Sequence, residues 1–184
     1  MAKKELERKA EHVVVLETER LRLRKLSEGD AAFILKLLNE PSFIQNIGDK
    51  GVRTLDDACS YILNGPVANY QKFGFGPYLV ELGGANERGI PIGMCGLLKR
   101  ETLEDVDVGY ALAPQFWSRG YAREAVWGVL SFANKTLGLK RVVAITNPDN
   151  ASSIRLLETI GFQFEKTVRV SEVAAKVQLF AFEF

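Results

Sequence analysis

The stretch Trp117-Ser118-Arg119-Gly120-Tyr121-Ala122-Arg123-Glu124-Ala125 lies between an alternating apolar run and a long amphipathic pattern. The apolar run over 106–112 predicts a strand, and the pattern that follows Gly120 predicts a helix. The first N–H groups of a helix have no partner within the helix, and the helix dipole adds partial positive charge there. Gly120 and Ala122 leave the main chain open to a ligand, and Arg119 and Arg123 add full charges. The stretch therefore predicts an anion-binding turn, although a plain helix-capping turn would use the same residues.

The composition is that of an ordinary globular protein. The chain has 184 residues, of which 47% are hydrophobic, and its 24 basic and 23 acidic residues give a net charge of +1. This balance gives no electrostatic reason to expect nucleic acid or an anionic membrane as a partner. No apolar stretch is long enough to cross a bilayer, and the first residues lack the apolar segment of a secretory signal. We expect a cytoplasmic protein with a poorly ordered charged lead over 1–12 and a single domain over 13–184.

The cysteines and the histidine exclude several classes of site. Cys59 and Cys95 match no metal or redox spacing, and the only histidine, His12, lies in the charged lead. A Ser-His-Asp hydrolase, a Cys-His protease and a histidine-rich zinc site are therefore excluded, and we expect no metal.

Hydrophobic periodicity predicts an α/β domain with a mixed sheet. The predicted order is one strand, two helices, three strands, a helix, a strand, a helix and two strands. The strands cover 21–24, 78–82, 92–98, 105–112, 141–146, 162–170 and 173–182. The helices begin at Asp30, Thr54, Gly120 and Ala151; Pro41 ends the first, and Gly65-Pro66 ends the second. A ligand is expected where the fourth strand meets the long helix over 120–137.

Five segments in this order resemble a known family. They are Glu17-Thr18-Glu19-Arg20-Leu21-Arg22-Leu23-Arg24, Asp107-Val108-Gly109-Tyr110-Ala111-Leu112-Ala113-Pro114, the stretch from Trp117 to Ala125, Asn147-Pro148-Asp149-Asn150-Ala151-Ser152-Ser153, and Gly161-Phe162. Over about residues 16–184 the chain resembles the GNAT superfamily of acetyl-CoA-dependent N-acyltransferases, and within it the RimJ/RimL-like ribosomal-protein N-terminal acetyltransferases. The resemblance implies an α+β fold with a mixed, mostly antiparallel sheet of about seven strands and helices on both faces.

The resemblance also gives the segments their roles. The turn from Trp117 to Ala122 would cradle the pyrophosphate of coenzyme A, and the fourth strand would pair its backbone with the pantetheine arm. Asn150 would bind the arm near the thiol, with Ser153 beside the sulfur; both residues also suit plain capping of their helix. The residues expected to bind acetyl-CoA are Tyr110, Ala111, Leu112, Trp117, Arg119, Gly120, Tyr121, Ala122, Arg123, Asn150 and Ser153.

The expected reaction is attack of a neutral amine on a thioester. Many superfamily members use a late-helix tyrosine as the acid for the leaving thiolate, but Leu157 occupies that position, so Ser153 is the nearest donor. The family often carries a glutamate two residues before Gly-Tyr in the fourth strand, and Asp107 stands there. Asp107 could accept the amine proton directly or through water, or be a solvated strand residue. Glu124 lies in the first turn of the long helix, where it complements the dipole or fixes the turn.

The expected acceptor is an α-amino group of a protein or peptide. An α-amine has a pKa near 7.7–8.0, so neutralising it at pH 7 costs about 1 kcal/mol, against about 4–5 kcal/mol for lysine. Segments 43–52 and 69–77 are expected to line the acceptor site. Alternatives are a small-molecule N-acetyltransferase, a non-catalytic acyl-CoA-binding regulatory module, and a different nucleotide-binding α/β protein. The protein is expected to be a monomer or a homodimer.

Overall fold

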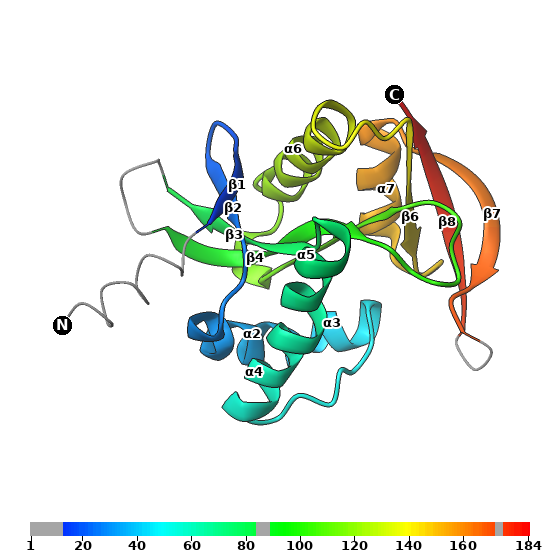
Figure 1. The fold of residues 1–184 in the computed structure, drawn as a ribbon. Helices are drawn as coiled ribbons and strands as arrows, with labels where there is room; N and C mark the ends of the chain where they lie inside the picture. Colours follow the sequence, from blue (N-terminus) through cyan, green and yellow to red (C-terminus); the bar gives the residue numbers. More distant parts are fainter. Residues whose placement is uncertain (1–12, 84–88, 172–174) are drawn as a thin grey trace.

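The computed structural model describes residues 13–83, 89–171 and 175–184, so the charged lead over 1–12 lies outside the described residues. Eight strands form one sheet in the order β1-β2-β3-β4-β5-β6-β8-β7 (Figure 1). The strands are β1 (Val14–Glu17), β2 (Leu21–Arg24), β3 (Pro77–Leu82), β4 (Ile90–Leu98), β5 (Asp107–Leu112), β6 (Arg141–Thr146), β7 (Gln163–Arg169) and β8 (Lys176–Glu183).

The sheet is mostly antiparallel, as predicted, and β5 with β6 is its parallel pair. These two strands are in register at one position, where Asp107 lies opposite Val143 and the Val143 N–H donates to the Val106 carbonyl at 3.0 Å. Beyond this position, toward their carboxyl ends, β5 and β6 are no longer paired. By contrast, β4 and β5 stay paired from Asp107 to Leu112. The sheet therefore parts between β5 and β6 beside the segments expected to bind a ligand.

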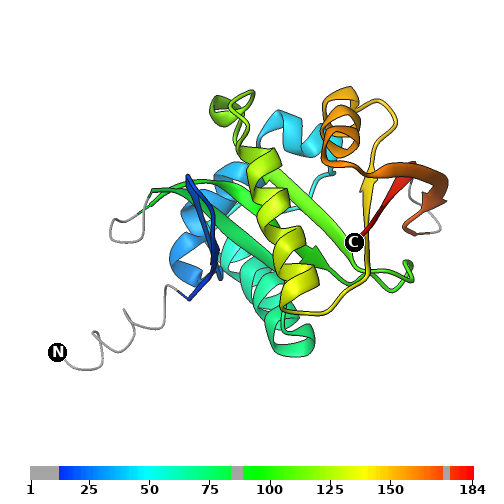
Figure 2. The same cartoon turned by 90° about the horizontal axis from the view of Figure 1, so that it is seen from above.

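Helices cover both faces of the sheet. They are α2 (Ala31–Leu38), α3 (Pro41–Asn46), α4 (Leu55–Ile62), α5 (Ala68–Phe73), α6 (Tyr121–Lys135) and α7 (Ala151–Ile160). Helix α6 crosses one face, and α2 and α4 lie against the other (Figures 1 and 2). The apolar stripe of α6, which includes Val126, Val129 and Leu130, packs with Leu157 of α7 into the larger core cluster. The second cluster joins Ile34 and Leu37 of α2 to Ala58 and Ile62 of α4. Within the described ranges, no helix is long and apolar enough to cross a membrane.

Two predicted boundaries differ from the structure. Gly65-Pro66 does not end the second helix: a π-helical turn, η2 (Leu63–Val67), carries the chain from α4 into α5 with Pro66 inside it. Proline removes one backbone hydrogen bond of a helix, and the wider π turn accommodates that loss. Pro41 follows the end of α2 but also opens α3, because proline suits the first helical position. Three short elements, α3, α5 and β1, were not predicted.

Strand β5 places its side chains alternately on the two faces of the sheet. Val108, Tyr110 and Leu112 contact the larger core beneath α6, whereas Ala111 contacts the second core near α2 and α4. The pairing of β5 with β4 has no register shift at Gly109, so no bulge interrupts the alternation. Asp107 therefore lies on the opposite face from Tyr110.

Candidate active site

The predicted anion-binding turn forms the entrance to α6. A short helix, η3 (Pro114–Phe116), leads into it, and two residues take left-handed backbone angles, Ser118 with φ 58° and Gly120 with φ 81°. In the described part of the chain, the backbone N–H groups of Arg119, Gly120, Tyr121 and Ala122 have no hydrogen-bond acceptor. Four consecutive free N–H donors at a helix N-terminus make an anion-binding site, which we call the cradle. Three of these donors belong to a glycine, Gly120, or to the half-buried residues Tyr121 and Ala122. This arrangement fits the pyrophosphate of coenzyme A.

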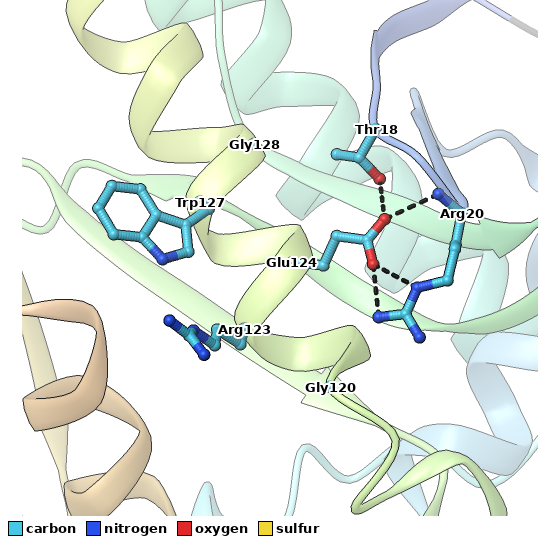
Figure 3. A pocket seen from close by; sticks show the side chains of 7 residues that line it. All are labelled: Thr18, Arg20, Gly120, Arg123, Glu124, Trp127 and Gly128. Atoms are coloured by element: carbon cyan, nitrogen blue, oxygen red, sulfur yellow. Dashed lines mark hydrogen bonds and ion pairs between the residues drawn. The ribbon is translucent and has the colours of Figure 1, made fainter.

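Arg20 and Glu124 brace this turn from the side of β2 (Figure 3). One oxygen of Glu124 accepts from Thr18 Oγ1 at 2.6 Å and from the Arg20 N–H at 2.8 Å; the other accepts from Arg20 Nε at 2.7 Å. Arg20 also donates from Nη1 to the Arg119 carbonyl at 3.1 Å, and its guanidinium lies 4.6 Å from the centre of the Tyr121 ring. Partial burial raises the pKa of Glu124, but the hydrogen bonds from Thr18 and Arg20 outweigh it and hold that pKa below its ordinary value. Of the two roles expected for Glu124, fixing the turn is the one its contacts support.

An open groove of about 540 Å³ lies on the outer side of the first turns of α6. Glu124 points toward the β1–β2 turn, while Arg123 and Trp127 lie on the other side of the helix (Figure 3). The groove is lined by Thr18, Arg20, Gly120, Arg123, Glu124, Trp127 and Gly128. Arg123 is exposed beside the cradle, as its predicted role in binding an anion requires.

Trp117 links the cradle to the end of β5. Its indole Nε1 donates to the Leu112 carbonyl at 2.7 Å, and the residue remains 49% exposed. The Leu112 carbonyl is therefore already engaged. The Ala113 N–H donates to the Ile92 carbonyl of β4, and in an antiparallel pair alternate residues face the same neighbour, so Ala111 also faces β4. The backbone of Tyr110 is therefore the freer part of the strand edge facing the gap. Trp117 thus fixes where the strand ends relative to the turn.

The start of α7 approaches β5 across the gap. Asn150 caps the helix, with its Oδ1 accepting from the Ser153 N–H at 3.1 Å. The Ser153 Oγ lies 2.8 Å from the Tyr110 phenol oxygen. The structure therefore brings Asn150 and Ser153, which were expected near the thiol end of the cofactor, together with Tyr110 of the strand expected to pair with the pantetheine arm. It shows Asn150 in its capping role only.

Asp107 lies apart from this group. It is 1% exposed, and both of its carboxylate oxygens accept from Arg100 Nε, at 3.1 and 3.2 Å. Burial raises the pKa of Asp107 above its ordinary value, while the charge of Arg100 pulls it back down. The alternative that Asp107 is a solvated strand residue is wrong, because the side chain is buried and paired.

Two aromatic residues of segment 69–77 lie in the core instead of lining an acceptor site, and the role of the rest of the segment stays a prediction. Tyr70 and Phe75 are buried in the larger core, where Tyr70 stacks on Tyr78 with ring centres 5.6 Å apart. The Tyr70 hydroxyl donates to the Pro77 carbonyl and accepts from the Leu26 N–H. Tyr70 therefore has a structural role, because it joins the start of β3 to the segment that follows β2. Aromatic residues beside glycines are found in cores as well as in binding sites. Here Tyr70 and Phe75 belong to the core.

Sequence reasoning missed Thr18, Arg20 and Arg100. Thr18 and Arg20 lie in one of the segments that resemble the family, but their contacts with Glu124, 106 and 104 residues later, depend on the fold. Arg100 precedes β5 by a loop and carries no local signal. Among the described residues, no group of three potential metal ligands lies close enough together to hold an ion.

Comparison with known proteins agrees with the geometry. Residues 20–163 match the family model described as the acetyltransferase (GNAT) domain. The chain is 30% identical over 155 residues to the uncharacterized N-acetyltransferase YoaA of Bacillus subtilis (strain 168), covering 84% of this chain and 86% of YoaA.

Two solved structures share the fold at lower identity. One is RimL, a ribosomal L7/L12 α-N-protein acetyltransferase in complex with coenzyme A, with a TM-score of 0.76 and 16% identity over 92% of this chain and 97% of RimL. The other is the spermidine N-acetyltransferase of Vibrio cholerae in complex with coenzyme A and spermine, with a TM-score of 0.72 and 19% identity over 90% of this chain and 96% of that one. The family model and YoaA carry the assignment: the chain belongs to the GNAT acetyltransferase family and is an N-acetyltransferase.

Proposed function

We propose that the protein transfers an acetyl group from acetyl-CoA to the α-amino group of a protein or peptide. The observation that carries the proposal is the parting of β5 from β6 beside the free N–H groups of the α6 turn. A gap in a sheet offers one strand edge to an extended ligand arm, and the turn beside it offers donors to an anion. A long ligand with an anionic middle and a thin arm fits both features at once.

The cofactor-binding roles follow from this placement. The main chain of Arg119, Gly120, Tyr121 and Ala122 holds the pyrophosphate, with the charge of Arg123 beside it. The backbone of Tyr110 to Leu112 lines the pantetheine arm, and Trp117 fixes the strand end. Asn150 positions the start of α7, where Ser153 faces the sulfur.

The chemistry requires a neutral amine and a tolerated leaving group. Bound acetyl-CoA supplies a thioester: the amine nitrogen bonds to the carbonyl carbon, the C–S bond breaks, and the sulfur leaves with the electron pair. We assign Ser153 as the hydrogen-bond donor to that sulfur. Asp107 is the proposed acceptor of the amine proton. Because its side chain is 1% exposed, the proton reaches it through water, and burial favours the protonated form that results.

The nature of the base supports an α-amine as acceptor. An aspartate is a weak base even where burial raises its pKa, and an α-amine near pKa 7.7–8.0 needs little help to lose its proton at pH 7. RimL, whose name specifies an α-N-protein acceptor, shares the fold. The spermidine N-acetyltransferase also shares it, and this keeps a small-molecule amine as the second candidate acceptor.

The test is an acceptor screen with acetyl-CoA, read as free thiol released. The panel contains short peptides with free N-termini, the same peptides with blocked N-termini, polyamines and aminoglycosides. Release that depends on a free N-terminus supports the proposal. Release with polyamines or aminoglycosides alone would assign a small-molecule acceptor, and coenzyme A binding without release for any amine would indicate a non-catalytic module.

A further inference from the structure

Two hydroxyl groups from different elements meet at the thiol end of the proposed cofactor site. The Tyr110 phenol on β5 lies 2.8 Å from Ser153 Oγ on α7, and both side chains are half-buried. The phenol oxygen is also 3.5 Å from the Ser153 carbonyl. Ser153 is thus held twice, at its N–H by the Asn150 side chain and at its hydroxyl by Tyr110.

Either oxygen can be the donor across this 2.8 Å contact, and we choose between them by acidity. A phenol is far more acidic than an aliphatic hydroxyl, so the phenol is the better donor of the two. When Tyr110 donates, the Ser153 oxygen is occupied as an acceptor and its own O–H is free to point elsewhere. Burial raises the pKa of Tyr110 to about 12, against a smaller lowering by the bond to Ser153, so the phenol keeps its proton at neutral pH.

Helix α7 itself offers no phenol to the site. Leu157, which occupies the position expected for a late-helix tyrosine, is 1% exposed and packs in the larger core. The only phenol that the described residues place in hydrogen-bond contact with the start of α7 is that of Tyr110. It reaches this point from the strand on the other side of the gap.

We infer that Tyr110 is a positioning residue for thiolate release, whose phenol donates to Ser153 Oγ and so aims the serine O–H at the leaving sulfur. The inference rests on the proposed function, which puts the sulfur beside Ser153. No proton leaves either hydroxyl: the sulfur departs with the electron pair of the broken C–S bond and accepts a hydrogen bond from Ser153. A donor that is itself hydrogen-bonded is polarised and becomes a stronger donor, so Tyr110 acts through Ser153.

The test uses coenzyme A alone, because its free thiol ionises without any acceptor amine. Affinity is measured by calorimetry from pH 6 to pH 10 for the wild type and for Tyr110→Phe. If Ser153 and Tyr110 favour the thiolate, the wild-type affinity rises about tenfold through the thiol pKa near 8.5, and this rise falls to less than about threefold in the variant. Tyr78→Phe, which removes a hydroxyl from a fully buried tyrosine of β3, is the matched control and keeps the rise.

Turnover gives the second readout. Tyr110→Phe is expected to lower kcat about tenfold while the KM for acetyl-CoA changes by less than about twofold. Because the phenol acts through the serine, the double variant Tyr110→Phe/Ser153→Ala should be no slower than Ser153→Ala alone, within about twofold.

Three results would overturn the inference. A full pH-dependent rise in Tyr110→Phe would do so, as would an equal loss of affinity at every pH, which indicates packing. A double variant whose loss is the product of the two single losses would show that the hydroxyls act separately. Failure of the wild type to bind coenzyme A at any pH would instead overturn the proposed function itself, and the inference with it.

Discussion

Arg20 and Glu124 lie 104 residues apart in the chain and form a two-point ion pair at the entrance to α6, with Arg20 Nε at 2.7 Å and Nη2 at 2.6 Å from the same carboxylate oxygen. The pair ties the β1–β2 turn to the helix whose N-terminus forms the anion cradle. The Arg20 guanidinium also donates to the Arg119 carbonyl, so the same side chain contacts the main chain of the cradle. The residues of the cradle are contiguous in the sequence, but contacts from a distant part of the chain hold the cradle in place.

Glu124→Gln should lower the free energy of unfolding at pH 7 by about 1.5–3 kcal/mol, the range for hydrogen bonds to a charged group. The folded-state pKa of Glu124 lies below its unfolded value, so the stabilisation is fully present above the unfolded pKa near 4.3 and is lost as pH falls through the folded pKa. Urea unfolding at pH 7 and at pH 3 should show the difference shrinking at the lower pH.

Glu183→Gln is the matched control, since Glu183 pairs with Arg141 at 2.6 Å but is 67% exposed. An exposed pair is worth less than about 1 kcal/mol. A Glu124→Gln loss no larger than the Glu183→Gln loss, or one that is constant with pH, would contradict the bracing role.

Two glycines at opposite ends of α6 separate backbone strain from cofactor binding. Gly120 and Gly138 have φ of 81° and 69°, so valine at either position should cost about 1–2 kcal/mol of stability. A side chain at Gly120 would also meet Arg20 Nη2 at 3.3 Å and stand in the cradle, whereas nothing lies within 4 Å at Gly138. Only Gly120→Val should weaken coenzyme A binding, by at least about tenfold or 1.4 kcal/mol.

Calorimetry on both folded variants checks this expectation. Equal affinities for coenzyme A in Gly120→Val and Gly138→Val would show that the turn from Trp117 to Ala122 does not bind the cofactor.

Asp107→Asn should slow acetylation most at acidic pH. A base is needed only while the amine is protonated, so the rates of wild type and variant should converge between about pH 8 and 9 for an α-amine acceptor. Initial rates at saturating substrates from pH 6 to 9 provide the measurement. A constant deficit would mean that Asp107 positions the substrate, and no deficit would mean that water or a backbone carbonyl accepts the proton.

Arg100→Gln tests the role of Asp107 as the base by changing its ion-pair partner instead of Asp107 itself. Arg100 holds the pKa of Asp107 down, so its removal should move the acidic limb of the pH–rate profile to higher pH with the same acceptor. The acceptor's own pKa is unchanged by this substitution and serves as the internal reference. A limb that stays in place would exclude Asp107 as the group that titrates there.

The fold was predictable where local chemistry marks an element. Thr54 caps α4 through a bond from the Asp57 N–H at 3.1 Å, and Gly161 ends α7 in a left-handed conformation, as their sequence positions indicated. The π turn at Pro66 was not predictable, because packing of both flanking helices holds a segment that proline would otherwise end.

The site was predictable where a continuous segment forms it. The stretch from Trp117 to Ala122 forms a turn that leads into α6, as predicted, and Asn150 caps α7, which is the alternative role given to it. The environment of Asp107 was not predictable, because its burial and its partner Arg100 come from the fold around β5. The contact between Tyr110 and Ser153 likewise joins residues 43 positions apart across the gap in the sheet.

The most direct test of the account is the position of the transferred acetyl group on one peptide. A peptide with a free N-terminus and one internal lysine is incubated with the protein and acetyl-CoA, and fragment masses locate the added acetyl group. The account predicts acetylation at the α-amine, with little at lysine, and loss of transfer when the N-terminus is blocked. Acetylation at lysine in preference to the α-amine, or transfer unaffected by blocking the N-terminus, would contradict it.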